Sequence, residues 1–407
     1  KRARMSVLRG VSIRIPLLVY GAADQIENGN DITIDNFTQL IDDASWEEYM
    51  PKDFKKETFD LLRECFDRSI FTGAAKRIYN LVKEAEEMSI EDRINKIATI
   101  FSYFHNPDKE TVLTPWRVVN MHMSDCVGGW CFFNEEFDAP YTEENKYQEQ
   151  VHCARYVDRG NVTHDIFDDY NTRILEINSK TGLYPLYMAY SVFKSVKEKK
   201  YREFGLTDER GNRIGSDEYG TQVVNDQEIW KDVLQDNIFV VCRTDMAVSI
   251  TKRTLAGFKP WRTNVKCYTH DVSVNDLIEA NIIKKTDKKI EKIDKTYFYD
   301  DKEYLPCDMI QVIKAKSDLF KTDVVKGRDF WHVYNSIPTS SDEDINNMNF
   351  NAIVGNPPYS VMDGGGRDAT ASTPIYQKFV ELSIGLAPNY NSLIMPARWY
   401  SGGRGLD

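Results

Sequence analysis

The stretch of sequence that decides the fold is Phe350-Asn351-Ala352-Ile353-Val354-Gly355-Asn356-Pro357-Pro358-Tyr359. Its first half is a short apolar run of the kind that forms a fully buried strand. Pro357 and Pro358 then fix their own backbone angles and carry no N–H groups, so a strand cannot continue through them. The stretch therefore predicts a buried strand that ends in a rigid turn, with Asn356 before the two prolines and Tyr359 after them.

Other short apolar runs occur before and after this stretch, and helical or polar segments separate them. They are residues 173–177, 238–242, 265–268 and 393–395. Strands that alternate with helices are typical of a doubly wound, Rossmann-like α/β sheet. In such sheets the ligand lies beyond the carboxyl ends of the strands, so we expect the turn at Asn356 to face the ligand site.

The first part of the chain has a different, helical pattern. Ser89 begins a capping-box pattern, and apolar residues then recur at helical spacing as far as Phe104. A second amphipathic helix is predicted for residues 73–88. We therefore expect two domains, which are a mainly helical coupler or linker in residues 1–110 and an α/β core in residues 111–407. Long polar segments predict insertions in that core near residues 205–227 and 281–330.

The composition excludes several classes of protein. Among 407 residues, 52 Lys and Arg stand against 63 Asp and Glu, which gives a net charge of −11. The chain as a whole thus lacks the positive surface of a protein that binds nucleic acid unaided. No apolar run approaches the roughly 18 to 20 residues that cross a membrane. Seven Cys residues without a Cys-x-x-Cys spacing favour reduced thiols over a disulfide framework or a metal site. We expect a cytoplasmic protein.

The turn itself carries groups with a recognisable chemistry. Asn356 offers a side-chain oxygen, Pro357 a carbonyl that no strand ladder uses, and Tyr359 an aromatic face. Two acceptors and a ring are the groups needed to hold a planar amine. The alternative interpretation is an ordinary proline-rich turn after a strand.

This signature closely resembles that of the amino-group methyltransferases that use S-adenosylmethionine, in particular the N6-adenine DNA methyltransferases of restriction-modification systems. The resemblance implies that the catalytic residues are Asn356, Pro357, Pro358 and Tyr359. The Asn356 side-chain oxygen and the Pro357 carbonyl would accept hydrogen bonds from the N6 amine and aim its lone pair at the methyl group. Tyr359 would stack on an adenine that is flipped out of the duplex.

Further landmarks of the family occur in the expected order from about residue 111 to the end of the chain. A Thr-Pro segment resembles the one that closes over the methyl donor, an acidic turn with one glycine follows the first strand, and single acidic residues follow the second and third strands. The residues that this resemblance implies in binding S-adenosylmethionine are Thr114, Pro115, Glu176, Asn178, Gly182, Asp245 and Asp271.

Two positions depart from the family pattern. Lys180 stands where the acidic turn usually has its earlier glycine. Arg243 aligns with the acidic residue that receives the ribose hydroxyls, and Asp245 follows two positions later. Alternative interpretations remain open for the cofactor residues: a turn without a ligand for Glu176 to Gly182, helix capping for the two aspartates, and a helix start for the Thr-Pro pair.

The resemblance also implies a setting for the chain. We expect a piece of a large bacterial restriction-modification enzyme, with helicase or nuclease parts and a target-recognition domain in the same polypeptide. DNA would then be held mainly by regions outside these residues, and the sheet would be incomplete at its C-terminal end. The alternatives are methylation of a protein glutamine or an RNA base, or a non-catalytic coupler whose cofactor site has decayed.

Overall fold

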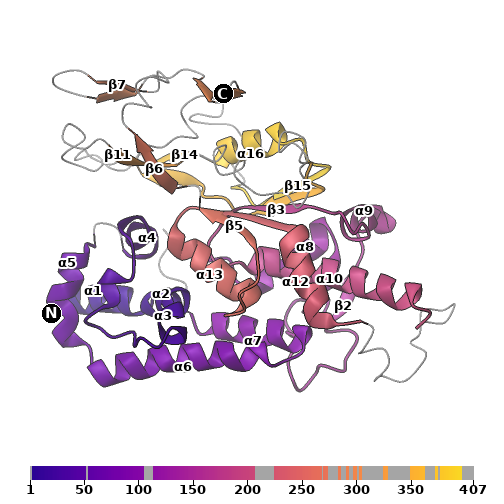
Figure 1. Cartoon of the computed structure of the whole chain (residues 1–407), viewed down its shortest axis with the longest axis horizontal. Coiled ribbons are helices and arrows are strands. Elements are labelled where there is room, and N and C mark those ends of the chain that lie inside the picture. The colour runs from indigo at the N-terminus through magenta and orange to yellow at the C-terminus, as the bar shows by residue number, and fades with distance from the viewer. Residues whose placement is uncertain are drawn as a thin grey trace.

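The computed structural model describes residues 2–51, 54–104, 113–206, 224–267, 269–273, 283–285, 290–292, 297–299, 302–304, 324–328, 349–362, 372–374 and 376–396. Figure 1 shows helices gathered in the N-terminal part of the chain and a sheet in the C-terminal part. Within the described ranges, no helix is both long enough and apolar enough to cross a membrane.

Helices dominate the first hundred residues, as the sequence predicts. They are α1 (Arg2–Ser12), α2 (Ile15–Ala22), α3 (Asp24–Glu27), α4 (Asp43–Tyr49), α5 (Lys56–Leu62), α6 (Arg68–Glu86) and α7 (Ile90–Ser102), with 3-10 turns at Phe37–Gln39 and Arg63–Cys65. Ser89 caps α7 by accepting a hydrogen bond from the Asp92 N–H, so the predicted helix start is confirmed. The preceding helix begins earlier than predicted, because Asp67 caps its first turn.

The remaining elements alternate between helices and short strands. They are α8 (Trp116–Cys126), β1 (Gly129–Cys131), β2 (Cys153–Arg155), a 3-10 turn at Asp158–Gly160, α9 (Asn161–Phe167), β3 (Ile174–Ser179), α10 (Leu183–Glu203), α12 (Asp226–Asp236), β4 (Ile238–Cys242), α13 (Asp245–Ala256), β5 (Asn264–Cys267), β6 (Thr269–Ser273), β7 (Ile283–Lys285), β8 (Ile290–Lys292), β9 (Tyr297–Tyr299), β10 (Lys302–Tyr304), β11 (Val324–Arg328), β12 (Ala352–Gly355), β13 (Ser360–Met362), β14 (Ser372–Pro374), α16 (Tyr376–Gly385) and β15 (Tyr390–Leu393).

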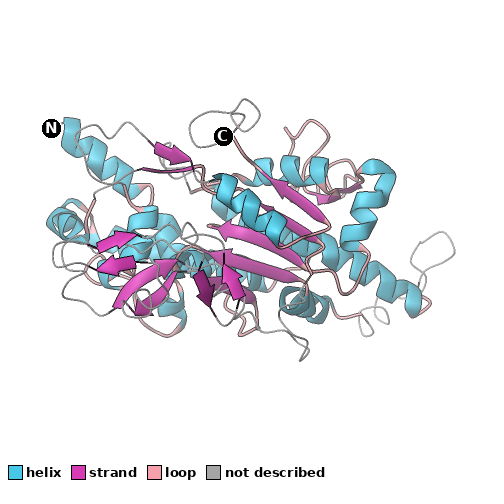
Figure 2. Cartoon of the chain, turned by 90° about the horizontal axis from the view of Figure 1, so that it is seen from above, coloured by secondary structure: helices cyan, strands magenta, loops and turns pink. Residues whose placement is uncertain are grey.

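Five of these strands form one sheet, in the order β15-β12-β3-β4-β5. Every neighbouring pair in it is parallel. The strands β3, β4 and β12 are buried along their whole length, as parallel strands covered on both faces must be. Figure 2 shows these strands side by side with helices running across them. The predicted α/β fold with a parallel sheet is confirmed.

Helices cover both faces of this sheet. On one face Leu175, Phe239 and Ile353 form a small core with Leu382 of α16 and with Leu386, which directly follows that helix. On the other face Ile174, Val240 and Val354 belong to a much larger core that also includes residues of α10, α12 and α13. In Figure 1, α16 lies above the sheet and α12 and α13 lie below it. The helix that connects β12 to β15 therefore packs on one face of the sheet, and the helices that connect β3 to β4 pack on the other. This is the doubly wound arrangement.

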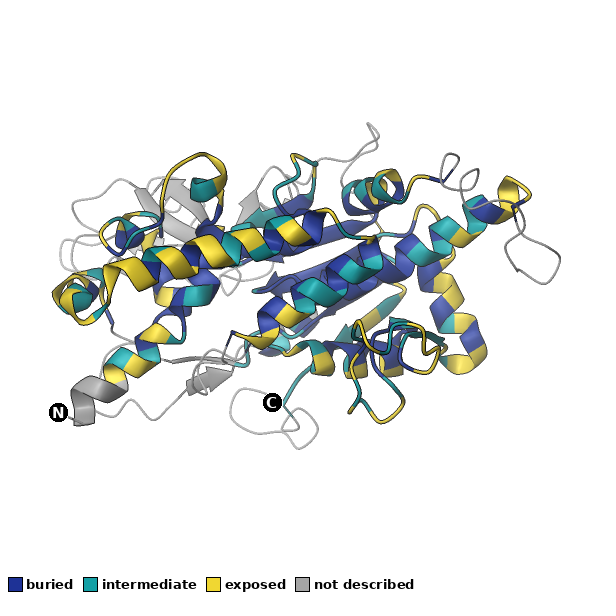
Figure 3. Cartoon of the chain, turned by 90° about the horizontal axis from the view of Figure 1, so that it is seen from below, coloured by how far each residue is buried: buried dark blue, intermediate teal, exposed yellow. Residues whose placement is uncertain are grey.

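The helical N-terminal region and the sheet region share this larger core. Helix α2 packs along α13, and the Tyr20 hydroxyl lies 3.3 Å from that of Thr254. Arg93 of α7 donates to the Leu255 carbonyl at 2.9 Å. Figure 3 shows the consequence: the long N-terminal helices alternate buried and exposed residues, and the strands beyond them are buried. The predicted boundary near residue 110 lies outside the described residues.

The structure corrects the predicted position of the last strand and describes only parts of the two predicted insertions. The last strand was predicted at residues 393–395, but β15 is Tyr390–Leu393, because the pairing with β12 begins at Tyr390 opposite Ala352. Of the predicted insertion at 205–227, the structure describes the two ends, and α12 starts at Asp226. Within 281–330 it describes only the short strands β7 to β11.

Candidate active site

The site lies where β3 and β12 run side by side. From β3 the chain moves through α10 toward β4, whereas from β12 it moves through α16 toward β15, in the opposite direction along the sheet. Diverging crossovers open a crevice beyond the carboxyl ends of the two central strands. Gly355 ends β12 so close to its neighbour that a Cβ atom there would lie 3.1 Å from the Ile177 carbonyl oxygen. The loops that follow Ser179 and Gly355 therefore meet at this crevice.

Asn356 is held by two hydrogen bonds. Its side-chain nitrogen donates to the Thr114 hydroxyl at 2.9 Å, and its side-chain oxygen accepts from the Tyr359 hydroxyl at 2.8 Å. Thr114 is 242 residues away along the chain, so this contact joins the segment before α8 to the end of β12. In this arrangement the amide nitrogen faces Thr114 and the amide oxygen faces Tyr359. The Asn356 oxygen is thereby presented as an acceptor on the Tyr359 side.

The prolines form a rigid, partly buried turn between these two residues. Pro357 is buried, whereas Pro358 and Tyr359 are half-buried. Burial raises the pKa of the Tyr359 hydroxyl above its ordinary value, so it remains a protonated donor at neutral pH. The four predicted catalytic residues are thus contiguous, and one of them, Asn356, touches a predicted cofactor residue.

Glu176 lies in the middle of β3, in an unusual environment for a carboxylate. Its side chain is buried, and its Oε2 atom has no hydrogen-bond partner in the described part of the chain. Burial raises the pKa of Glu176 to about 8, and the Ser179 side chain opposes this rise only in part. A buried carboxyl of this kind favours a positively charged or proton-donating ligand.

The loop after β3 turns sharply into α10. Asn178 is buried and has a left-handed φ of 64°, a conformation that Asn tolerates better than most residues. Gly182 has a φ of +76°, and its N–H donates to the Ser179 hydroxyl at 3.1 Å. A Cβ atom on Gly182 would lie 3.1 Å from Thr251 Cα of α13, so only glycine fits here. Asn178 and Gly182 therefore shape the loop rather than cap the helix with a side chain.

The departures from the family pattern lie in the same region. The Lys180 carbonyl accepts a hydrogen bond from the Tyr49 hydroxyl of α4 at 3.0 Å. Burial lowers the pKa of the Lys180 side chain, Glu48 opposes this effect, and Arg243 adds to it. Lys180, Glu48 and Arg243 are therefore electrostatic neighbours at the ends of β3 and β4. Asp245, two residues beyond Arg243, is exposed on the first turn of α13.

Two predicted cofactor residues are placed apart from this group. Pro115 is exposed and immediately precedes α8, where it supplies no side-chain cap. Asp271 lies on β6, where it pairs with Lys326 of β11 in a separate two-stranded sheet, and its side chain is not among those described. The structure thus brings Thr114 to Asn356 and keeps Glu176 and Asn178 on β3, just before the turn at Gly182, without joining Pro115 or Asp271 to them by a described contact.

A partly buried chain of hydrogen bonds that no motif indicated links α8 to α10 and β15 next to the site. His122 of α8 makes hydrogen bonds to the Tyr184 hydroxyl at 2.9 Å and to the Ser392 hydroxyl of β15 at 2.8 Å. Burial lowers the pKa of His122 to about 4, so the ring is neutral at physiological pH. Burial raises the pKa of Tyr184, and charge on Glu176 and on Tyr359 would raise it further. His122 therefore anchors the helix that Thr114 precedes, and Tyr184 lies between the two loops of the site.

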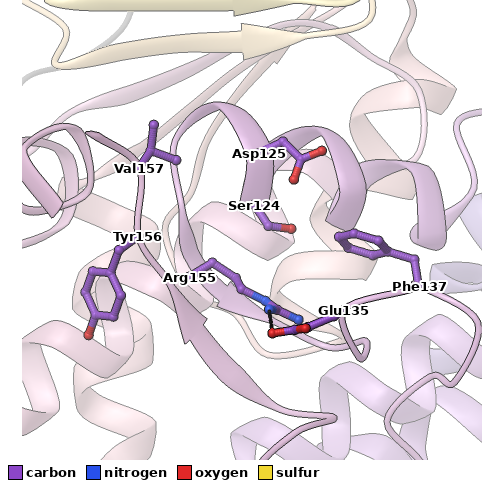
Figure 4. Close-up of a pocket in the computed structure, with 7 residues that line it drawn as sticks. All are labelled: Ser124, Asp125, Glu135, Phe137, Arg155, Tyr156 and Val157. Atoms are coloured by element: carbon purple, nitrogen blue, oxygen red, sulfur yellow. Dashed lines mark ion pairs between the residues drawn. The ribbon is translucent and has the colours of Figure 1, made fainter. Parts of the chain in front are cut away.

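An open pocket of about 520 Å³ lies elsewhere, at the far end of α8. Ser124, Asp125, Glu135, Phe137, Arg155, Tyr156 and Val157 line it, and Figure 4 shows their arrangement. Trp116 and Ser124 are separated by about 12 Å of helix. The ion pair between Arg155 and Glu135 spans 3.6 Å and is largely exposed on the Glu135 side, so it adds little stability. None of the predicted site residues lines this pocket.

Part of the chain is similar to known methyltransferases. Residues 236–407 match the model of the family described as Eco57I restriction-modification methylase. This match includes Asn356 to Tyr359 and begins beyond Glu176. The chain is also 39% identical over 75 residues to a protein of Mycoplasma pneumoniae (strain ATCC 29342 / M129 / Subtype 1) named "Uncharacterized adenine-specific methylase". That similarity covers 17% of this chain and 18% of the relative. Both comparisons support a methyltransferase.

Proposed function

We propose that the crevice at Asn356 transfers the methyl group of S-adenosylmethionine to N6 of an adenine in DNA. The observation that carries the proposal is the position of the Asn356 amide. It follows the strand at the switch point of the sheet, and Thr114 holds its nitrogen so that its oxygen remains an acceptor. The family match over residues 236–407 and the relative's name support the same class of reaction.

The residues of the β3 loop fit S-adenosylmethionine. This cofactor carries an ammonium group and supplies a methyl group bound to a positively charged sulfur. Glu176 offers a buried carboxyl oxygen without a hydrogen-bond partner in the described chain. The loop that follows its strand takes a close path past α13, for which a glycine is needed at position 182. A cationic ligand would lower the raised pKa of Glu176 and so stabilise its ionised form. We therefore assign Glu176 to the charged end of the cofactor.

The acceptor residues fit a planar amine. The lone pair on adenine N6 is delocalised into the ring, which makes the amine a poor nucleophile. Hydrogen bonds from its two N–H groups to the Asn356 oxygen and to the Pro357 carbonyl would localise the lone pair and orient it. Catalysis of this kind depends on positioning and fixed dipoles, and it requires no strong general base among the side chains.

A base inside a duplex cannot reach this turn, so the target adenine must be flipped out, at a cost of a few kcal/mol. Stacking on Tyr359 would offset part of that cost. Because the net charge of the chain is −11, we propose that DNA is gripped mainly by a target-recognition domain beyond these residues. A helicase or nuclease in the same restriction-modification polypeptide is part of this proposal, and so is weak DNA affinity for this chain alone.

The test is transfer of a tritiated methyl group from S-adenosylmethionine to DNA that carries no methylated adenine. We expect to recover the label in N6-methyladenine after enzymatic digestion. We expect Asn356→Ala to lower the rate of methyl transfer at least about 100-fold. The control is Asn391→Ala, which removes an exposed amide on β15 and should retain the rate.

Parallel reactions with RNA and with a release-factor protein test the alternative acceptors, because an RNA base and a glutamine side chain are also planar amines. Label in cytosine, in RNA or in the protein instead of adenine would contradict the proposal. A folded protein that fails to bind S-adenosylmethionine in a calorimetric titration would favour the non-catalytic coupler.

A further inference from the structure

Helix α4 lies across the carboxyl ends of β3 and β4. Three of its side chains, at the spacing that shares one helix face, make hydrogen bonds to the loops after these strands. The Ser45 hydroxyl accepts from the Met246 N–H at 3.1 Å, Glu48 Oε2 accepts from the Thr244 hydroxyl at 2.5 Å, and the Tyr49 hydroxyl donates to the Lys180 carbonyl at 3.0 Å. The N-terminal helical region therefore packs against the chain segments that follow β3 and β4, beside the place where we propose that the cofactor binds.

Glu48 is the notable member of this group. Its side chain is almost completely buried, with 5% of the residue exposed. Thr244, which caps α13, donates to one carboxylate oxygen, whereas the other oxygen, Oε1, has no hydrogen-bond partner in the described chain. Buried carboxylate oxygens are rarely left without a donor, because their desolvation is costly. The Oε1 atom can therefore accept a hydrogen bond from a ligand, with the Lys180 and Arg243 cations as electrostatic neighbours.

The position of Glu48 indicates which donor fits. In doubly wound folds an acidic residue near the end of the second strand accepts hydrogen bonds from ribose hydroxyls. Here Arg243 follows that strand, and the nearest acid along the chain, Asp245, is exposed. Burial raises the pKa of the Cys242 thiol at the end of β4, and charge on both Glu176 and Glu48 raises it further. The two carboxyl groups therefore flank the same strand end.

We propose that Glu48 accepts the ribose hydroxyls of S-adenosylmethionine, so that the N-terminal helical region completes the cofactor site. This inference rests on the proposed function. Glu48 takes the place that an acid at position 243 would have, and it reaches that place from a helix almost 200 residues earlier in the chain. Cofactor binding and the docking of α4 on α13 then stabilise each other.

The experiment is a calorimetric titration with two probes, S-adenosylhomocysteine and its 2′,3′-dideoxy analogue, which lacks both ribose hydroxyls. Glu48→Gln keeps an oxygen for Thr244 and removes the charge. Its matched control is Glu47→Gln, which neutralises an exposed carboxylate on the same helix. We expect Glu48→Gln to weaken S-adenosylhomocysteine binding about 10- to 100-fold and to leave binding of the dideoxy analogue within about twofold.

Equal weakening of both probes would overturn the inference, because it would make Glu48 a purely structural residue. Equal affinity of Glu48→Gln and Glu47→Gln for S-adenosylhomocysteine would overturn it as well. Both outcomes leave the proposed function intact, whereas a wild-type protein that binds neither probe would contradict the cofactor itself.

A measurement on the unmodified chain covers the case in which Glu48→Gln does not fold. We expect S-adenosylhomocysteine to slow amide hydrogen exchange in α4 and the dideoxy analogue to slow it much less. Identical protection of α4 by both probes would also overturn the inference.

Discussion

The Tyr359 hydroxyl donates to the Asn356 side-chain oxygen at 2.8 Å and so uses one of the two lone pairs of the acceptor that the proposed reaction assigns to the adenine amine. An amine can take the place of this hydroxyl after Tyr359 turns away. The same rotation would free the tyrosine ring to stack on the incoming base. In this structure the Tyr359 hydroxyl is therefore a competitor of an incoming amine for the Asn356 oxygen.

The first prediction separates the hydroxyl of Tyr359 from its ring. Tyr359→Phe removes the competing donor and keeps the stacking surface, so we expect its kcat to equal or exceed that of the wild type. Tyr359→Ala loses the ring, and loss of about 1–3 kcal/mol of stacking should raise KM for DNA about 5- to 150-fold. Initial rates of methyl transfer at varied DNA concentration measure both effects. A Phe variant as impaired as the Ala variant would assign the hydroxyl a direct part in the reaction.

A second prediction concerns Thr114, which the structure joins to Asn356 rather than to the β3 loop. Thr114→Val leaves the Asn356 nitrogen without its acceptor, so the amide loses its fixed orientation. We expect kcat to fall about 10-fold, equivalent to one hydrogen bond of about 1.4 kcal/mol, and Thr114→Ser to restore it.

The affinity of the Thr114→Val variant for S-adenosylhomocysteine distinguishes the two roles that Thr114 can have. An unchanged dissociation constant is expected if Thr114 positions Asn356. A rise in the dissociation constant that matches the loss of rate would instead make Thr114 a cofactor ligand, as the family resemblance implies. Thr99→Val, on the exposed side of α7, is the control for the substitution itself.

Some of this site could be predicted from the sequence because its signal is local. An apolar run followed by two prolines determines a strand and its end within ten residues, and β12 does end at Gly355, directly before Asn356. The predicted position of the last strand is wrong because its residues carry no such local signal. Residues 390–392 are Tyr, Asn and Ser, and β15 forms through backbone pairing at the edge of the sheet with partly exposed side chains.

The rest depends on contacts between distant segments, which no local pattern records. Glu48 and Thr244 are 196 residues apart, and His122 and Ser392 are 270 residues apart. Glu48 by itself is one acidic residue on a short amphipathic helix, and His122 is one of six dispersed histidines. Only the packing of the helical region on α13 and of α8 on β15 gives these side chains a place near the site.

A third prediction follows from the buried carboxyl of Glu176. Its folded-state pKa of about 8 lies above the ordinary value of 4.5, so burial disfavours the ionised form. Below pH 4.5 the group is protonated in both states and the penalty is absent. The penalty grows as the pH rises and is complete above pH 8, where it is on the order of 5 kcal/mol.

Glu176→Gln should therefore stabilise the cofactor-free protein at pH 9 and have a much smaller effect at pH 5.5. Urea unfolding at the two pH values measures the difference, and Glu198→Gln, an exposed residue on α10, is the control. The same variant should bind S-adenosylhomocysteine more weakly than the wild type. A stabilisation that is the same at both pH values would show that the folded-state pKa of Glu176 is not raised.

The last prediction tests how closely the helical region and the sheet region are joined. A Cβ atom at Gly21 of α2 would lie 2.3 Å from the Met246 sulfur and 2.8 Å from Ile250 Cγ1, both on α13. Alanine is the better helix former by about 1 kcal/mol, but this overlap outweighs that gain. We expect Gly21→Ala to lower the free energy of unfolding by about 1–3 kcal/mol and, by loosening α4 on α13, to weaken S-adenosylhomocysteine binding.

Gly73 of α6 provides the matched comparison, because an added Cβ atom there meets nothing within 4 Å. Gly73→Ala should raise the free energy of unfolding by about 0.5–1 kcal/mol, since only the helix propensity changes, and should leave cofactor affinity unaltered. Denaturant unfolding measures the stability of the two variants, and titration with S-adenosylhomocysteine measures their cofactor affinity. If Gly21→Ala unfolds the helices before the sheet and leaves binding unchanged, the N-terminal helices do not contribute to the cofactor site.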